Sequence, residues 1–310
     1  MNTILPLQVN NRMIGITLVL IAASLWGISG TVAQYLFQLN GFTAEWLVVV
    51  RLQIAGFLML LLAYRKQKSR IWHVWKMNQT RNQLILFSLI GMLGVQYTYF
   101  AAIEESNAAT ATVLQYLGPV FIAIYIVVKE KRVPTSRELF IIFLALLGTF
   151  LLVTNGQLTS LSLSIWGVFW GIASGVALAF YTLQPYTLIK NYGTMIVVGW
   201  GMFIGGLGFS LFFHPWNISG ELNAMTLMAI FFVIIFGTLI PFYCYLESLQ
   251  FLSASETSIL SCAEPLSAAI IAVVWLQVSL GIMQWIGTLF ILLTIIFLSK
   301  QGKKGKEMNR

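Results

Sequence analysis

Long uninterrupted runs of apolar residues dominate the chain, and polar or charged residues separate them at regular intervals. Each run is close to the length of about 20 residues that an α-helix needs to cross a bilayer. None shows the period-two alternation of a membrane strand, and a helix satisfies its own backbone groups in lipid. The pattern therefore predicts an all-α integral membrane protein with ten transmembrane helices, at residues 13–35, 44–64, 83–103, 109–128, 138–154, 165–188, 194–213, 225–249, 255–277 and 280–299.

Composition supports this prediction. Hydrophobic residues make up 58% of the 310 positions and charged residues only 9%, whereas soluble domains carry about 25% charged residues. Such a chain cannot cover a water-facing surface. Disorder and a disulfide-stapled scaffold are also excluded, because the chain has only 7 Pro and 2 Cys.

The basic residues indicate how the predicted helices are oriented. Of the 18 Lys and Arg residues, all except Arg51 precede the first span, lie in even-numbered connections or form the C-terminal tail. Cytoplasmic loops retain Lys and Arg, so we expect both termini in the cytoplasm and the protein in the cell membrane (inner or plasma membrane). The net charge of +8 then reflects topology and attraction to anionic lipid headgroups, and we expect no nucleic-acid partner.

Two parts of the chain resemble each other at a constant offset of 146 positions. Because each copy would contain an odd number of helices, the second copy would enter the membrane from the opposite side, as in many secondary transporters. We therefore predict two inverted five-helix repeats, 1–154 and 155–310. The matching pairs are Gly91 with Gly237, Tyr97 with Tyr243, Tyr99 with Tyr245, Leu114 with Leu260 and Pro119 with Pro265.

The paired prolines suggest where a site would lie. Pro119 and Pro265 each stand about ten residues from opposite ends of their spans, roughly 15 Å deep and near the bilayer midplane. A proline there removes one backbone hydrogen bond and bends the helix. The freed carbonyl is tolerated where it faces protein or a water-filled cavity. Proline is also common in membrane helices without a function, but the equal depths favour a substrate site between the two halves.

Two charged residues lie at membrane depth, where a charge is costly and points to function. Glu264 immediately precedes Pro265, and it could carry a coupled proton, bind a cationic group of the substrate, or pair with Arg51. Arg51 lies roughly 10 Å below the outer end of its span. Its guanidinium cannot shed its charge. It could therefore bind a carboxylate, snorkel to the interface or hold neighbouring carbonyls.

Aromatic and amide side chains on the repeated helices complete the predicted substrate site, since such groups supply stacking and hydrogen bonds. The alternative for any one of them is an interfacial aromatic belt or packing between helices. Tyr97 and Tyr99 are two positions apart on a helix and cannot both face one cavity. The predicted substrate-binding residues are Trp26, Arg51, Gln96, Tyr97, Gln115, Pro119, Tyr181, Tyr243, Ser261, Glu264 and Pro265.

Regularly spaced glycines predict close helix packing. Gly167, Gly171 and Gly175 recur at every fourth position, as do Gly201 and Gly205. Small residues at this spacing let helix backbones approach one another. Packing within the bundle and packing in a homodimer explain them equally well.

The sequence contains none of the motifs that would indicate an enzyme. It has no Asp, no G-x-S-x-G, no H-E-x-x-H and no phosphate-binding loop of the G-x-x-x-x-G-K-[ST] type. We therefore expect no catalytic activity, metal site or cofactor. Passive or ion-coupled movement of a solute remains. A membrane-embedded enzyme would need converging catalytic groups, and a sensor would usually carry a soluble output domain.

The chain resembles the EamA family of the drug/metabolite transporter superfamily over nearly its whole length. One departure is Leu276-Gln277, where the family often has an acidic residue. The resemblance rests on Leu25-Trp26-Gly27, Arg51, Ser106-Asn107-Ala108-Ala109, Leu117-Gly118-Pro119, Glu130, Ala254-Ser255, Ala263-Glu264-Pro265 and Trp285-Ile286-Gly287-Thr288.

The resemblance implies ten-helix carriers with duplicated halves that work by alternating access. Such carriers commonly export amino acids or related metabolites. The stretch 261–267 further suggests an uncharacterised bacterial inner-membrane subgroup. The expected partners are a small-molecule substrate, the bilayer and a coupled proton. Broad efflux of amphipathic toxic compounds, and import of a metabolite, are the alternatives, because fold analogy does not select a substrate.

Overall fold

A computed structural model gives the structure of the chain. Most of the described residues fall into four long stretches, and the remainder are short segments or single positions. Side chains are described for most of these residues from 11 onward. The described residues are 4–106, 108–118, 121, 122, 125, 128, 129, 131, 133, 135–154, 165–261, 263, 264, 267, 281–283, 285–287, 289, 290 and 293.

Helices and the turns between them make up the described part of the first half, which contains no strand. Thr43 caps one helix by accepting a hydrogen bond from the Trp46 N–H, and Glu45 follows in the first turn, where a negative charge favours the helix N-terminus. The helices are α1 (Ile4–Asn40), α2 (Ala44–Gln67), the 3₁₀ segment η1 (Lys68–Trp75), α3 (Asn78–Leu86), the π-helical segment η2 (Phe87–Met92), α4 (Leu93–Glu105), α5 (Ala108–Gln115) and α7 (Ser136–Thr154).

The second half is likewise helical over its described residues. Gly193, with φ of 84°, separates two of its helices, in a backbone conformation that favours glycine. Asn223 and Thr226 form a capping box at the start of another. The helices are α8 (Ile165–Leu183), α9 (Tyr186–Tyr192), α10 (Thr194–Ser210), α11 (Ala224–Ile234), the π-helical segment η4 (Ile235–Leu239), α12 (Ile240–Ser248) and α13 (Ala254–Leu260).

Five helical stretches of the described part are long and apolar enough to cross a membrane. Two shorter apolar helices, 139–148 and 194–210, coincide with further predicted spans. The predicted spans 109–128, 255–277 and 280–299 lie partly outside the described residues. The five long stretches are Asn11–Asn40, Ala44–Trp75, Asn78–Glu105, Ile165–Tyr192 and Ala224–Ser248.

Two π-helical segments interrupt spans for which the sequence pattern predicted regular helices. Segment η2 covers Phe87–Met92 and segment η4 covers Ile235–Leu239. At the offset of 146 positions these segments overlap, and they contain the matched pair Gly91 and Gly237. A π-helical turn inserts a residue into an α-helix and often marks a functional site. The two halves therefore share a backbone irregularity as well as a sequence pattern.

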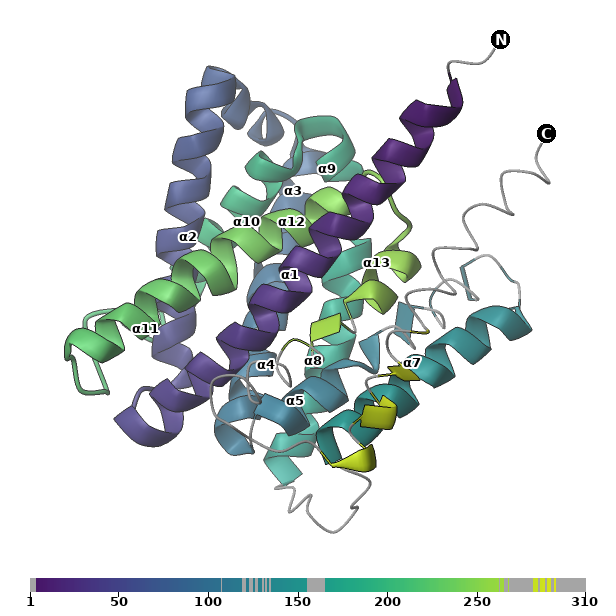
Figure 1. Ribbon diagram of the computed structural model, residues 1–310. Helices are drawn as coiled ribbons and strands as arrows, with labels where there is room; N and C mark the ends of the chain where they lie inside the picture. The colour runs from purple at the N-terminus through teal and green to yellow at the C-terminus, as the bar shows by residue number, and fades with distance from the viewer. Residues whose placement is uncertain are drawn as a thin grey trace.

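Helices of one half pack on helices of the other. Helix α1 lies against α12, α8 lies against α4, and α2 lies against α10, and Figure 1 shows α1 running diagonally across α12. Trp26 of α1 packs on α12 through Phe242, and Trp170 of α8 packs on α4 through Tyr97. The flanking sequences Trp26-Gly27-Ile28 and Trp170-Gly171-Ile172 also match. The two interfaces are thus counterparts of each other.

Glycines bring these helices close together within the chain. A Cβ on Gly206 would lie 2.9 Å from the backbone nitrogen of Gln53, so α10 and α2 meet nearly backbone to backbone. A Cβ on Gly175 of α8 would lie 3.2 Å from the carbonyl oxygen of Leu114 on α5. Packing within the bundle accounts for these contacts, and the homodimer stays a prediction.

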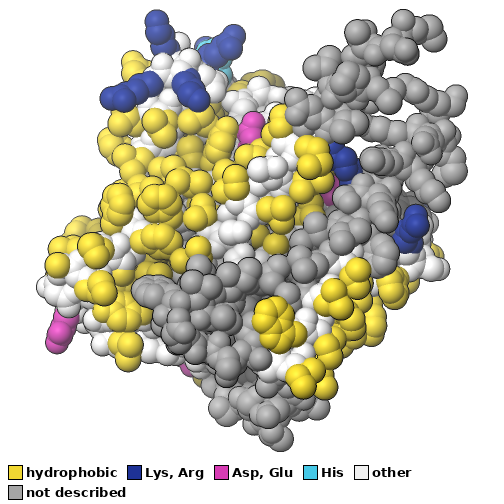
Figure 2. Space-filling view, viewed as in Figure 1, with side chains coloured by type: hydrophobic (Ala, Val, Ile, Leu, Met, Phe, Trp, Pro, Cys, Tyr) yellow, Lys and Arg dark blue, Asp and Glu magenta, His cyan; other side chains and the backbone are white. Residues whose placement is uncertain are grey.

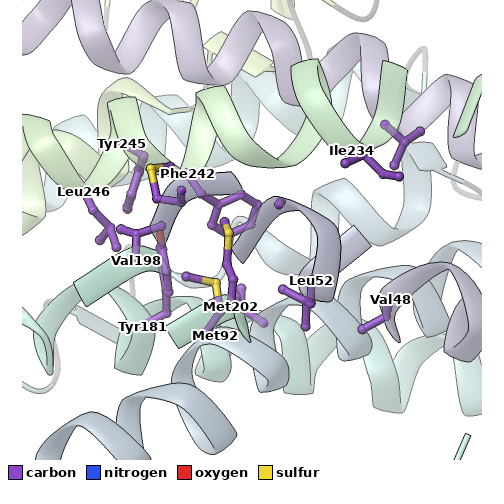
Figure 3. Packing of buried hydrophobic residues seen from close by; sticks show 14 of the residues in the cluster. Val48, Leu52, Met92, Tyr181, Val198, Met202, Ile234, Phe242, Tyr245 and Leu246 are labelled. Carbon is purple, nitrogen blue, oxygen red and sulfur yellow. The ribbon is translucent and has the colours of Figure 1, made fainter. Parts of the chain in front are cut away.

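The main core lies where α2, α4, α8, α10 and α12 converge. Figure 3 shows Tyr181 of α8 and Phe242 of α12 meeting beside Met92 and Met202. The rings of Tyr181 and Phe242 are 5.6 Å apart in an edge-to-face arrangement. This core holds the walls of the site described below.

The two ends of the molecule differ in charge. Figure 2 shows dark blue Lys and Arg side chains gathered at the upper left, over the end of α2 and η1. Helix α9, which carries Lys190, also contacts η1. At the opposite end the turn after α1 meets the loop before α11, where the Glu221 N–H donates to the Asn40 carbonyl oxygen. The described residues of that end include Glu but neither Lys nor Arg.

Candidate functional site

A cavity lies between helices of the two halves. It measures about 40 Å³, which is room for a few water molecules at about 10–15 Å³ for each. Helices α1, α2, α4, α8 and α12, the segment η4 and the end of α5 contribute to its wall, together with the residues that follow α5 and α13. Its lining residues are Trp26, Ser29, Gly30, Arg51, Val95, Gln96, Tyr99, Phe100, Gln115, Tyr116, Leu178, Tyr181, Gly237, Phe242, Ser261 and Glu264.

Arg51 supplies a buried cation to this cavity. Its side chain is only 3% exposed, and its Cζ lies 3.7 Å from the centroid of the Phe100 ring. The ring face attracts the guanidinium. Its Nε has no hydrogen-bond partner among the described residues, and no described carboxylate forms an ion pair with it. A buried cation with an unused donor and no ion-pair partner is suited to binding an anion.

Three further side chains carry polar atoms that the described residues leave unpaired. Both amide atoms of Gln96, the indole Nε1 of Trp26 and the hydroxyl of Tyr181 are buried without a partner. Leaving such a group buried and unpaired costs about 1–3 kcal/mol. All three residues line the same cavity as Arg51. The concentration of unpaired donors at one place indicates a ligand-binding site.

Glu264 lines the cavity, and two tyrosine hydroxyls contact its carboxyl group. Its side chain is 5% exposed. The Tyr99 hydroxyl lies 3.3 Å from Oε1 and the Tyr116 hydroxyl 3.3 Å from Oε2. Tyr99 interacts electrostatically with both Glu264 and Arg51. Glu264 and Arg51 therefore share a cavity and a common neighbour, but they do not form the ion pair that was one of the sequence-based alternatives.

Both repeats break a helix at the cavity. Helix α5 ends at Gln115 and a turn follows at 116–117, whereas α13 ends at Leu260 and a turn follows at Ser261. Proline has no N–H, so Pro265 cannot donate to the carbonyl oxygen four positions earlier, that of Ser261. The Tyr116 hydroxyl donates to this oxygen at 2.9 Å. A carbonyl freed by the sequence is thus paired across the interface between the halves.

Aromatic rings form one wall of the cavity. Trp26 lies 4.9 Å from Phe242 and 5.2 Å from Tyr245, measured between ring centroids. Tyr181 stacks on Tyr245 at 5.8 Å, and the Tyr245 hydroxyl is hydrogen-bonded to Thr182. This network fixes the rings and leaves the Tyr181 hydroxyl and the Trp26 Nε1 unpaired.

A tight contact between α1 and η4 closes the same wall. A Cβ on Gly237 would collide with the side chain of Ser29. Only glycine allows the π-helical segment to approach α1 this closely. The pair Gly91 and Gly237 in the sequence repeat was the signal for this position, although its contact with Ser29 could not be predicted.

The structure places the predicted site residues in three groups. Tyr97 and Tyr243, which are counterparts in the two halves, lie outside the cavity. Instead the Tyr97 hydroxyl donates to Glu45 at 3.2 Å. Pro119 and Pro265 lie outside the described residues. The other predicted residues line the cavity, namely Trp26, Arg51, Gln96, Gln115, Tyr181, Ser261 and Glu264.

Sequence reasoning left several lining residues out of the predicted set. Tyr99 and Tyr116 carried a signal, because both are aromatic residues on the repeated helices. Phe100, Phe242, Leu178 and Val95 carried none, since an apolar residue in an apolar span does not reveal which way it faces.

The arrangement is chemically suited to a small zwitterion. Arg51, Trp26, Gln96 and Tyr181 offer donors for a carboxylate, and Glu264 offers an acceptor for an ammonium group. The aromatic wall adds surface for apolar parts of a ligand.

A family model and two similar proteins all describe transporters. The chain matches the EamA-like transporter family over residues 13–154 and again over residues 165–300. It is 40% identical to the uncharacterised inner membrane transporter YicL of Salmonella typhimurium over 290 residues, which are 94% of this chain and 96% of that protein. It is 25% identical to the uncharacterised transporter YwfM of Bacillus subtilis, over 93% of this chain and 94% of that protein.

A solved crystal structure shows the same fold. It superposes with a TM-score of 0.74 and covers 95% of this chain and 98% of the solved chain. The two sequences are 15% identical, so the similarity concerns the fold alone.

Proposed function

The chain belongs to the EamA-like transporter family, and from this premise we propose that it is a bacterial inner-membrane protein and a secondary carrier for a small zwitterionic metabolite. An amino acid or a related compound is the proposed substrate, and export is the proposed direction. The substrate carboxylate would bind Arg51, and its ammonium group would bind Glu264. Movement of the solute would occur by alternating access around the cavity.

One observation carries the proposal. A fully buried arginine without an ion-pair partner lines a cavity in which the polar atoms of Gln96, Trp26 and Tyr181 are also unpaired. A ligand carboxylate would supply acceptors for these donors. Without such a ligand each group is a cost to the fold, so a binding role explains why the sequence contains all of them at one place.

Several features support two inverted five-helix halves around this cavity, with ten spans in total. The family match occurs twice along the chain. The interfaces of α1 with α12 and of α8 with α4 are counterparts, and so are the π-helical segments η2 and η4. Helix breaks at corresponding places in both halves, after Gln115 and after Leu260, are typical of carriers that bind their solute at the repeat interface.

The small cavity supports alternating access. Its volume of about 40 Å³ holds a few water molecules and no whole amino acid. A solute must therefore enter through a movement that separates the halves. The irregular backbone at η2, η4 and the two helix breaks gives the helices places to bend.

Charge segregation supports the proposed orientation. The end of the molecule that carries η1 and Lys190 is basic, and cytoplasmic loops retain Lys and Arg. We propose that this end faces the cytoplasm, with the loop 211–223 on the outside. Both termini would then lie in the cytoplasm.

The proposal is tested by metabolite profiling of bacterial cells. Cells that overproduce the protein are compared with cells that overproduce Arg51→Gln, and amino acids and related zwitterions are measured inside and outside. We expect at least one zwitterion to accumulate outside only with the unaltered protein. The compound found is then loaded into liposomes that contain the purified protein, and its exchange is measured directly.

Arg81→Gln is the matched control, because Arg81 is exposed at the basic end and does not line the cavity. This variant should transport normally. Fluxes that are equal for the unaltered protein and Arg51→Gln across the panel would contradict the proposal. Uptake in place of release would overturn the proposed direction and leave the site unchanged.

A further inference from the structure

The carboxyl group of Glu264 belongs to a cluster with more hydrogen-bonding contacts than hydroxyl hydrogens. Tyr99, Thr112 and Tyr116 each have one hydroxyl hydrogen to donate. Among themselves and with other described residues, these hydroxyls form five close oxygen–oxygen contacts. These join Tyr99 to Thr112 and to Glu264, Thr112 to the Ala108 carbonyl oxygen, and Tyr116 to the Ser261 carbonyl oxygen and to Glu264.

The three shortest contacts use all three hydrogens. Thr112 Oγ1 lies 2.6 Å from the Ala108 carbonyl oxygen, which has no hydrogen of its own, so Thr112 must donate there. The shorter contact of Tyr99, to Thr112 at 3.0 Å, is then a hydrogen bond only if Tyr99 donates, and we assign its hydrogen there. Tyr116 donates to the Ser261 carbonyl oxygen at 2.9 Å. No hydroxyl hydrogen remains for Glu264.

The two contacts to Glu264 are the longest of the five. Each measures 3.3 Å, whereas a hydroxyl that donates to an ionised carboxylate lies at about 2.5–2.7 Å. An ionised Glu264 would therefore face two oxygen lone pairs, which would repel it. A proton on Glu264 removes the charge and supplies the missing hydrogen for one of the two contacts.

We propose that Glu264 is a proton-binding site that holds its proton in this conformation, and that Tyr99 and Tyr116 are positioning residues that turn their hydroxyl hydrogens to the carboxylate when the proton leaves. The proton goes to water on the side to which the site opens. The carboxylate then accepts two charge-assisted hydrogen bonds in its place.

The rearrangement leaves the surrounding backbone paired. When Tyr116 turns to Glu264, the Ser261 carbonyl oxygen keeps its hydrogen bond from the Glu264 N–H at 2.9 Å. When Tyr99 turns, Thr112 still donates to Ala108. Both hydrogen-bonding patterns are therefore available without unfolding a helix, and the protonation of one carboxyl selects between them.

Other titratable groups around Glu264 come from three helices and the segment after α5. The cavity that Glu264 lines also contains Arg51 from α2, Tyr99 from α4 and Tyr181 from α8. Tyr116, from the segment after α5, lines it as well. Helix α1 contributes Trp26, Ser29 and Gly30, and α12 contributes Phe242, none of which titrates. Arg51 interacts electrostatically with Tyr99.

The consequence for transport rests on the proposed function. A substrate ammonium group and a proton would compete for the same carboxyl group, so the protein would exchange one for the other. An inward proton gradient would then drive the substrate outward. The proton-binding site itself does not depend on the identity of any solute.

Infrared spectroscopy of the purified full-length protein in lipid nanodiscs, without solute, tests the proton site. A band from a protonated carboxyl group should be present at neutral pH and should disappear at higher pH. It should be absent in Glu264→Gln and unchanged in Glu221→Gln, because Glu221 is exposed outside the cavity. A spectrum without such a band at neutral pH, or one that Glu264→Gln leaves unaltered, would overturn the proposal.

The tyrosines give a second measurement on folded, conservative variants. In Tyr99→Phe and in Tyr116→Phe the ionised carboxylate loses one donor, so the band should persist to higher pH, with a proton affinity about tenfold greater in each variant. An unchanged titration in both would show that the hydroxyls do not serve the carboxylate. Because no solute is present, a failure here is distinct from a failure of the transport assay.

Discussion

The guanidinium of Arg51 lies over the ring of Phe100, with 3.7 Å between Cζ and the ring centroid, and both residues line the cavity. The ring holds the cation from one side and offers it no hydrogen bond. The contact with Phe100 therefore positions the guanidinium but leaves its Nε without a hydrogen-bond partner. This relationship makes Arg51 a candidate anchor for a carboxylate.

Arg51→Lys should weaken substrate binding although the positive charge remains. A lysine ammonium is a point charge and cannot form the paired hydrogen bonds of a guanidinium with a carboxylate. We expect the KM for the zwitterion found by profiling to rise about tenfold or more, since hydrogen bonds to charged groups contribute roughly 1.5–3 kcal/mol. Liposome uptake kinetics measure this, and an unchanged KM would exclude direct contact between Arg51 and the substrate.

Tyr181→Phe should separate binding from stability. The Tyr181 hydroxyl is fully buried and unpaired, so its removal relieves a desolvation cost of about 1–3 kcal/mol. We expect the Tm in detergent to stay the same or rise, and the affinity for the substrate to fall. The matched variant is Tyr245→Phe, whose hydroxyl bonds to Thr182 at 2.9 Å, and this variant should lower the Tm. Equal destabilisation by both would mean that the Tyr181 hydroxyl serves the fold.

The sequence predicted the helical segments and the residue types of the site better than the direction in which each side chain faces. The apolar runs located the described helices, and Arg51 and Glu264 stood out because charge in lipid is costly. The predicted substrate-binding set contained Tyr97 and not Tyr99, whereas the cavity is lined by Tyr99 and not by Tyr97. Both follow η2, and the residue inserted by a π-helical turn rotates everything after it relative to a regular helix. The structure brings Tyr99 to the cavity.

A π-helical turn also explains why the facing of side chains in the second half could not be predicted. Tyr243 follows η4 and lies outside the cavity, whereas its neighbour Phe242 lines it. Hydrophobic periodicity assumes a constant rotation per residue, so it loses the phase at each irregular turn. The unpaired hydroxyl of Tyr181 and the contact of Gly237 with Ser29 depend on packing between distant segments, which periodicity does not contain.

Gly237→Ala should disrupt the contact between α1 and η4, because the added Cβ would collide with the side chain of Ser29. We expect a lower Tm and reduced transport, by an amount typical of overpacking, about 1–3 kcal/mol in folding free energy. Adding Ser29→Gly should restore much of both, since it removes the atoms that collide. A double variant as impaired as Gly237→Ala alone would show that the glycine is needed for another reason.

Cysteine labelling tests the proposed orientation. In a background with Cys244→Ala and Cys262→Ala, we expect a membrane-impermeant thiol reagent to label Glu221→Cys in intact cells. Lys190→Cys should react only after the cells are permeabilised. Both positions are exposed, so access to the reagent decides the result. The opposite labelling pattern would place the basic end outside and would contradict the interpretation of the loop charges.

The most direct test of the central claim is a cryo-EM structure of the protein in lipid nanodiscs with the transported zwitterion bound. Our account predicts density for the solute between the two halves, with its carboxylate at Arg51 and Gln96 and its ammonium group at Glu264. Solute density away from Arg51, with the described cavity closed in every conformation observed, would contradict it.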